Sequence, residues 1–68
     1  MKQLANIPGA PPLLVDRREA GRLLSVSPGT IDNLRLRGEL PSVKLLSRRL
    51  YDTRDLLAYI DARKAVRP

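Results

Sequence analysis

Residues 23–31 read LLSVSPGTI, and this stretch decides the fold. A hydroxyl such as that of Ser27 accepts hydrogen bonds from the backbone amides that a helix leaves free at its start. Pro28 suits the first helical position, because no backbone N–H is needed there. The stretch therefore predicts that one helix ends near Ser25, that another begins at Pro28, and that Val26 lies between them as an apolar plug.

The residues before this turn predict the first helix, over residues 17–25. Asp16 and Glu19 have the spacing of a capping box, in which the first side chain accepts hydrogen bonds from amides of the first turn. Residues at helical spacing then form one apolar stripe: Ala20, Leu23 and Leu24. An amphipathic helix that ends at the turn is the result.

The second helix is expected over residues 28–37, because Gly38 follows as a stop signal. Two short helices joined by a three-residue turn have the spacing of a helix-turn-helix. They also fit an ordinary helical hairpin. The pattern alone leaves both interpretations open.

The chain after Gly38 predicts a β-hairpin. Residues 42–45 and 49–51 are short β-capable runs, and residues 46–48 are expected to form the turn between them. Such a hairpin beside a helix-turn-helix is a candidate wing.

A last helix is expected over residues 54–64, capped by Asp52 or Thr53. Its apolar stripe consists of Leu56, Tyr59 and Ile60. The chain is therefore divided into a flexible N-terminal arm (1–12), one folded domain (13–64) and a frayed C-terminus (65–68).

The composition limits what the chain can do. Its 68 residues contain no Cys and no His, the commonest nucleophiles, general bases and transition-metal ligands. We therefore expect neither an enzyme, nor a cofactor, nor a small-molecule ligand. The lack of disulfides suits a reducing compartment, so the cytoplasm is expected. Residues 1–15 contain no apolar run long enough for a signal peptide or a membrane span.

The charge balance points to a polyanionic partner. Lys and Arg number 13 against 7 Asp and Glu, which gives a formal net charge of +6. Such a field attracts phosphate irrespective of sequence. A basic solvated surface without a partner is the alternative. A basic membrane-surface helix fits poorly, because the positive charge is spread over several short segments.

Two groups of residues carry a resemblance to known DNA-binding proteins. Val26-Ser27-Pro28-Gly29-Thr30-Ile31 and Gly38-Glu39-Leu40-Pro41 resemble the start and the stop of the recognition helix in MerR-type regulators and excisionase-like proteins. Arg49-Leu50-Tyr51-Asp52, followed by Asp55-Leu56, resembles the end of the wing and the start of the third helix in the same superfamily. The resemblance extends over residues 14–60 without a gap. It implies a winged helix-turn-helix, a mainly α fold with a small β-hairpin.

Within this superfamily the chain is more similar to excisionases than to MerR-type regulators, which continue into a long dimerisation helix and an effector domain. The resemblance implies a protein that binds and bends double-stranded DNA beside a recombination site. There it would help an integrase to excise a prophage or another mobile element. A small transcriptional regulator of the same fold is the alternative. Because one such domain buries little DNA surface, copies are expected to bind cooperatively, head to tail.

The recognition helix presents one face to the core and the opposite face to DNA. Ile31 and Leu34 are expected to face the core. The opposite side carries Gly29, Asp32, Asn33 and Leu36. Gly29 lets the backbone approach DNA closely, and Asn33 has the donor and the acceptor that read adenine. Asp32 either accepts from a cytosine amino group or is an ordinary solvated residue. The expected DNA-binding residues of this helix are Pro28, Gly29, Thr30, Asp32, Asn33, Arg35 and Arg37.

Phosphate contacts are expected from both helices. Arg17 and Arg18 lie in the first turn of their helix, where the macrodipole disfavours cations, and a nearby phosphate would offset that cost. Salt screening also makes them tolerable without a phosphate. Arg35 and Arg37 end the recognition helix, where they either contact phosphates or interact with the helix end. Thr30 either reaches a phosphate or caps the helix.

The wing is expected to supply most of the electrostatic affinity. Residues 42–51 carry Lys44, Arg48 and Arg49 without any acid, which is half of the formal net charge. Together with Ser47 at the turn, these residues are expected to contact phosphates. Strand alternation also places the stem of Arg49 where it can tuck against the core.

Three leucines depart from the family pattern. Leu46 stands where the wing turn usually carries Gly, Leu50 where a basic residue is common, and Leu36 where charge is usual. All three are expected to be exposed. They are either incidental or form a contact with a neighbouring protomer or an integrase.

Overall fold

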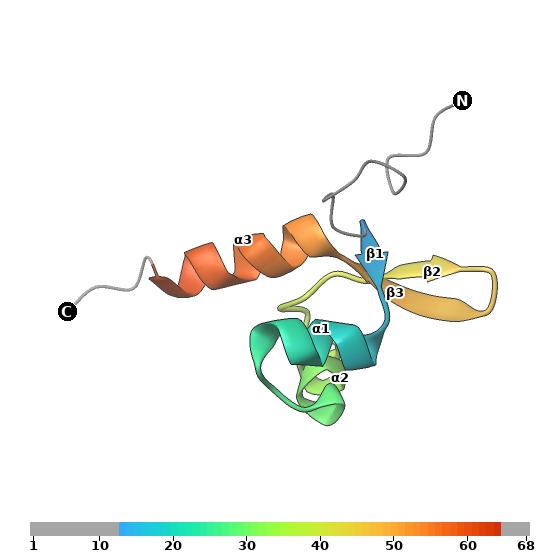
Figure 1. Cartoon of the computed structure of the whole chain (residues 1–68), viewed down its shortest axis with the longest axis horizontal. Coiled ribbons are helices and arrows are strands. Elements are labelled where there is room, and N and C mark those ends of the chain that lie inside the picture. The colour runs from blue at the N-terminus through green and yellow to red at the C-terminus, as the bar shows by residue number, and fades with distance from the viewer. Residues whose placement is uncertain (1–12, 65–68) are drawn as a thin grey trace.

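The computed structural model of the protein describes residues 13–64. Its elements are β1 (Leu14–Val15), α1 (Arg17–Leu24), α2 (Pro28–Leu36), β2 (Val43–Leu45), β3 (Arg48–Asp52) and α3 (Thr53–Lys64). The β2–β3 hairpin projects from one end of the molecule and α3 from the other, with α1 and α2 between them (Figure 1). This is the winged helix-turn-helix that the sequence predicts. The flexible arm and the frayed end that it also predicts lie outside the described residues.

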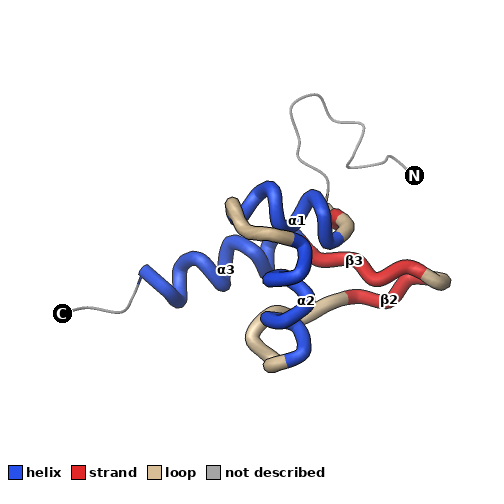
Figure 2. Tube along the Cα trace, turned by 90° about the horizontal axis from the view of Figure 1, so that it is seen from below, coloured by secondary structure: helices blue, strands red, loops and turns tan. Residues whose placement is uncertain are grey.

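β3 is the central strand of a three-stranded antiparallel sheet in the order β1-β3-β2. Val15 of β1 pairs with Tyr51, whereas Leu45 of β2 pairs with Arg48 at the outer end of the hairpin. β3 therefore runs from the wing tip into the body of the domain, as Figure 2 shows. β1 is not predicted from the sequence, because two residues are too few for a period-2 pattern.

Both predicted N-caps of the helix-turn-helix are confirmed. The Asp16 carboxylate accepts from the Glu19 backbone N–H at 2.9 Å, and the Ser27 hydroxyl accepts from the Thr30 N–H at 3.1 Å. α1 ends at Leu24, one residue earlier than predicted, because Ser25 takes a left-handed conformation with φ of 61°. α2 likewise ends one residue early, at Leu36.

The turn between the two helices lies directly against α1 at Gly21. The Val26 N–H donates to the Gly21 carbonyl at 2.8 Å. A Cβ at residue 21 would lie 2.7 Å from the Val26 carbonyl oxygen and 3.3 Å from the Pro28 nitrogen. Only glycine fits such a close approach of two backbones.

One small core joins the helices to the sheet. Its buried residues are Val15, Ala20, Ile31, Leu34, Leu40, Tyr51 and Leu56. Leu24 and Tyr59 pack against this cluster while partly buried. Every element except β2 contributes at least one of the residues in this core. The expectation that Ile31 and Leu34 face inward is confirmed, with exposed fractions of 0% and 4%.

Three expectations about apolar residues are wrong. Leu23 is 45% exposed, because the positions of α1 that become buried are Ala20 and Gly21. Val26 is 38% exposed and is not a buried plug, although its backbone N–H donates to the Gly21 carbonyl of α1. Leu50 is buried, at 8%. The strand register places it on the same face of the sheet as its partner Val43.

The hairpin turn is shorter than predicted. Arg48 already belongs to β3 and pairs with Leu45, which leaves Leu46 and Ser47 as a two-residue turn. Leu46 has φ of 58°. A positive φ at the first turn residue belongs to the turn types that match the twist of a hairpin, and glycine is preferred there. The leucine therefore adopts a strained backbone conformation.

α3 begins at Thr53, one residue earlier than predicted, and Asp52 caps it. The Asp52 carboxylate accepts from the Arg54 backbone N–H at 2.8 Å. The guanidinium of Arg54 also donates to it, and these hydrogen bonds hold the pKa of Asp52 below its usual value. The cap is therefore ionised at neutral pH. Within residues 13–64, no helix is both long and apolar enough to cross a lipid bilayer.

We expect Gly21→Ala to lower the free energy of unfolding by about 1–3 kcal/mol, because the added methyl group overlaps the Val26 carbonyl. Gly29→Ala is the matched control. The nearest atom to a Cβ there is the Ser27 hydroxyl at 3.8 Å, so that variant should be as stable as the wild type or up to about 1 kcal/mol more stable. Urea denaturation followed by circular dichroism measures both. Equal stability of the two variants would contradict the close approach.

Candidate nucleic-acid interface

α2 turns a small polar surface to solvent. Gly29, Asn33 and Leu36 are exposed and Asp32 is partly exposed, whereas Ile31 and Leu34 are buried on the other side. The Asn33 side chain makes no hydrogen bond within residues 13–64, so its donor and acceptor are both available. α2 therefore has the arrangement expected of a recognition helix.

Asp32 is tied to the neighbouring helix. The Arg17 guanidinium at the start of α1 donates to the Asp32 carboxylate at 2.6 Å. Both side chains are accessible, at 52% for Arg17 and 34% for Asp32. The predicted phosphate contact of α1 and the predicted base contact of α2 thus form one ion pair. Arg18, next to Arg17, is exposed and makes no ion pair within the described residues.

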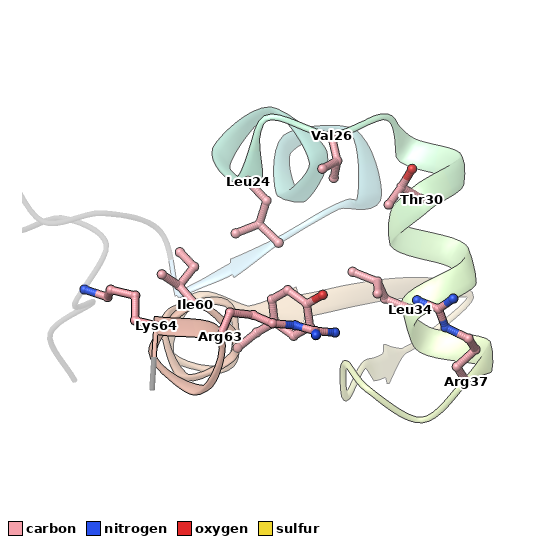
Figure 3. A pocket seen from close by; sticks show the side chains of 9 residues that line it. Leu24, Val26, Thr30, Leu34, Arg37, Ile60, Arg63 and Lys64 are labelled. Atoms are coloured by element: carbon pink, nitrogen blue, oxygen red, sulfur yellow. The ribbon is translucent and has the colours of Figure 1, made fainter. Parts of the chain in front are cut away.

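Thr30 lies beside the N-cap of α2. Its hydroxyl lies 3.0 Å from the Ser27 hydroxyl, next to the N-cap bond. Figure 3 shows Thr30 lining an open groove between the turn, α2 and α3. Pro28 is partly buried at the first position of α2. The cap is thus the Ser27 side chain, and both roles expected for the Thr30 hydroxyl stay predictions.

The two cations at the end of α2 differ in their surroundings. Arg37 pairs with Glu39 at 3.2 Å, and Glu39 also binds Arg63 of α3 at 2.7 Å. Glu39 thus links the end of the recognition helix to α3, a contact that the sequence analysis missed because it spans distant segments. Figure 3 shows Arg37 and Arg63 on the rim of the same groove, which has a volume of about 470 Å³. Arg35 is partly buried, and its Nε has no hydrogen-bond partner within residues 13–64.

The wing carries cations on both of its faces. Lys44 and Arg49 are opposite each other across the hairpin, whereas Arg48 points to the other face by strand alternation. All three are exposed, as is Ser47 at the turn. The guanidinium of Arg49 donates to the Ser42 hydroxyl at 2.9 Å. The packing of its stem against the core stays a prediction.

Ion pairs neutralise most cations elsewhere in the described part of the chain. Besides the pairs above, Glu19 binds Arg22, Asp52 binds Arg54 and Asp61 approaches Lys64. Hydrogen bonds from Arg22 also lower the pKa of Glu19, so that carboxylate is ionised at neutral pH. Within residues 13–64, the cations without a carboxylate partner are Arg18, Arg35, Lys44, Arg48 and Arg49. The wing therefore holds a concentrated positive charge.

The comparison with protein families gives a match that agrees with this geometry. The family model of the helix-turn-helix domain matches residues 14–64, from β1 to the end of α3. The chain belongs to the helix-turn-helix domain family. No curated protein and no solved structure gives a significant match. As a helix-turn-helix domain, the protein has the fold of a DNA-binding module, and α2 is the second helix of that motif.

Leu36, Leu46 and Leu50 do not form one exposed apolar surface. Leu36 on α2 is 71% exposed and Leu46 at the wing tip is 93% exposed, as expected. Leu50 is buried, so the expectation that all three are exposed is wrong. The apolar candidates for a protein contact are therefore Leu36 on α2 and Leu46 at the wing tip.

We expect the double variant Arg48→Ala, Arg49→Ala to bind every duplex more weakly and to flatten the log-affinity against log-salt slope by up to about two units. The reason is that each phosphate contact releases about 0.9 counterion. Fluorescence anisotropy over a range of KCl concentrations measures the slope. Lys64→Ala is the control, because Lys64 faces Asp61 at the end of α3 away from the wing (Figure 1). A folded double variant with the wild-type slope would place the phosphate contacts elsewhere.

Proposed function

We propose that the protein is a sequence-directed DNA-binding accessory factor of the excisionase type, which acts on double-stranded DNA in the cytoplasm. In this role it binds beside a recombination site, bends the DNA and directs an integrase toward excision. The observation that carries the proposal is the match of residues 14–64 to the helix-turn-helix domain family, which includes excisionase-like proteins. The resemblance of the recognition helix and the wing to excisionases supports the finer assignment.

The two DNA-facing elements divide the work of recognition. α2 enters the major groove, where the free amide of Asn33 hydrogen-bonds an adenine edge. The wing follows the backbone, and its cations on opposite faces reach phosphates on both sides of the hairpin. Base contacts thus come from α2, and most of the salt-dependent affinity comes from Lys44, Arg48 and Arg49.

One domain of this size cannot hold a long site alone. A single recognition helix and a single wing bury less than about 1,000 Å² of protein surface. Neighbouring copies therefore bind cooperatively, head to tail, and the exposed side chains of Leu36 and Leu46 are candidates for the contact between them. Phosphate contacts repeated along such an array offset the cost of bending the duplex.

We expect Asn33→Ala to weaken binding to the preferred site by roughly 1–3 kcal/mol and to change binding to unrelated duplexes little, because only the base contact is lost. Arg48→Ala provides the contrast, since loss of a phosphate contact weakens binding to all duplexes alike. Competition titrations with the preferred and the unrelated duplex measure both. Equal losses on the two duplexes for Asn33→Ala would show that Asn33 reads no base.

The accessory role is tested by reconstituted recombination. Adding the protein to its cognate integrase and the recombined attachment sites should increase excision and not integration. A variant with Arg48→Ala and Arg49→Ala, shown to be folded by circular dichroism, serves as the DNA-binding control and should not stimulate excision. Excision that proceeds equally well without the protein, together with a changed activity of a nearby promoter, would identify a transcriptional regulator instead.

A further inference from the structure

The ion pair between Arg17 and Asp32 stands out from the others because of its position. Asp32 is the single acid in α2, and it lies next to Asn33 on the face of the helix that solvent reaches. Arg17 begins α1, fifteen residues earlier, and donates to Asp32 Oδ2 at 2.6 Å. The second oxygen, Oδ1, makes no hydrogen bond within residues 13–64. One lone-pair-bearing oxygen is thus left for an outside donor.

Neither role expected for the separate residues accounts for this arrangement. A carboxylate on the DNA-facing helix opposes the approach of a polyanion. A cation engaged by that carboxylate neutralises no phosphate. An ion pair this accessible also contributes little to the stability of the fold. The pair therefore reduces affinity for DNA in general, which calls for a function of its own.

We propose that Asp32 is a specificity-determining residue and that Arg17 is its positioning residue. The inference rests on the proposed DNA-binding function. Arg17 holds Oδ2, so that Oδ1 faces the major groove and accepts a hydrogen bond from the amino group of a cytosine. On a preferred site both oxygens of the carboxylate accept a hydrogen bond, Oδ2 from Arg17 and Oδ1 from the cytosine.

The same arrangement penalises guanine and thymine at this position. Guanine and thymine present acceptor oxygens at the corresponding positions of the major groove, and these face Oδ1 without a proton between them. Arg17 meanwhile stays with Asp32 and adds no phosphate contact. Discrimination thus arises from a repulsive element that acts against the wrong partner. A protein with a formal net charge of +6 needs such an element, because its charge binds any duplex.

The first test measures phosphate contacts on a 20-base-pair duplex of mixed sequence, by anisotropy over a range of KCl concentrations. Asp32→Asn keeps the shape of the side chain but releases Arg17 to a phosphate. It should bind this duplex more tightly, with a slope steeper by about 0.9. Arg17→Ala should then remove that gain in the Asp32→Asn background and leave the slope unchanged in the wild-type background. Arg18→Ala is the matched control and should change the slope equally in both backgrounds.

The second test measures sequence preference by selection from a randomised duplex library. The wild type should select cytosine at one position within the site, and Asp32→Asn should lose that preference by on the order of tenfold. A wild-type protein that binds no duplex at low salt overturns the proposed function and this inference with it. If the wild type binds, an Asp32→Asn variant with unchanged slope and unchanged preference overturns the inference alone. Equal effects of Arg17→Ala in the two backgrounds also overturn it, because Arg17 would then contact phosphate independently of Asp32.

Discussion

The carbonyl oxygen of Val26 lies 2.7 Å from the place where a side chain at residue 21 would begin, and the N–H of the same residue donates to the Gly21 carbonyl. This contact brings the turn onto the surface of α1 and satisfies one of the carbonyls that a helix end leaves free. It also fixes the distance and the angle between α1 and α2. The burial of Ile31 depends on that angle. Asn33 lies on the same helix, so its placement follows from the same contact.

The positive charge available to a DNA phosphate depends on which cations are paired with carboxylates, and not on the composition alone. Most carboxylates of the described residues are used locally, either as helix caps or as partners of nearby arginines. Residues 42–51 of the wing contain no acid, and Lys44, Arg48 and Arg49 have no such partner within residues 13–64. Lys44 and Arg49 even lie opposite each other, and like charges in that position destabilise a hairpin. A phosphate bound between the two cations would relieve this repulsion.

The sequence predicts the elements and caps well, and it predicts long-range contacts poorly. Asp16 and Ser27 each act on a backbone amide three residues away, so their signals are local and correct. Leu23 has the correct helical spacing but lies beyond the edge of a core that is too small to cover it. The pairing of Arg17 with Asp32 depends on the packing of two helices, which no spacing rule contains. Gly21 carries a local signal, an isolated glycine inside a helical pattern, but its reason becomes visible only where the turn approaches it.

The strained turn of the wing sets the register of β3, and that register determines which side chains lie in the core and which lie on the wing. Leu46 holds a φ of 58°, and a left-handed conformation costs a residue with a side chain roughly 1–2 kcal/mol. Its side chain is 93% exposed and recovers little of that cost by burial. A looser turn with one more residue would relieve the strain but would shift the pairing of β3 by one position. Such a shift turns every side chain of the strand to the opposite face. Tyr51 would leave the core, and Arg49 would leave the face that it shares with Lys44. The tight turn therefore persists because one register serves both the core and the wing.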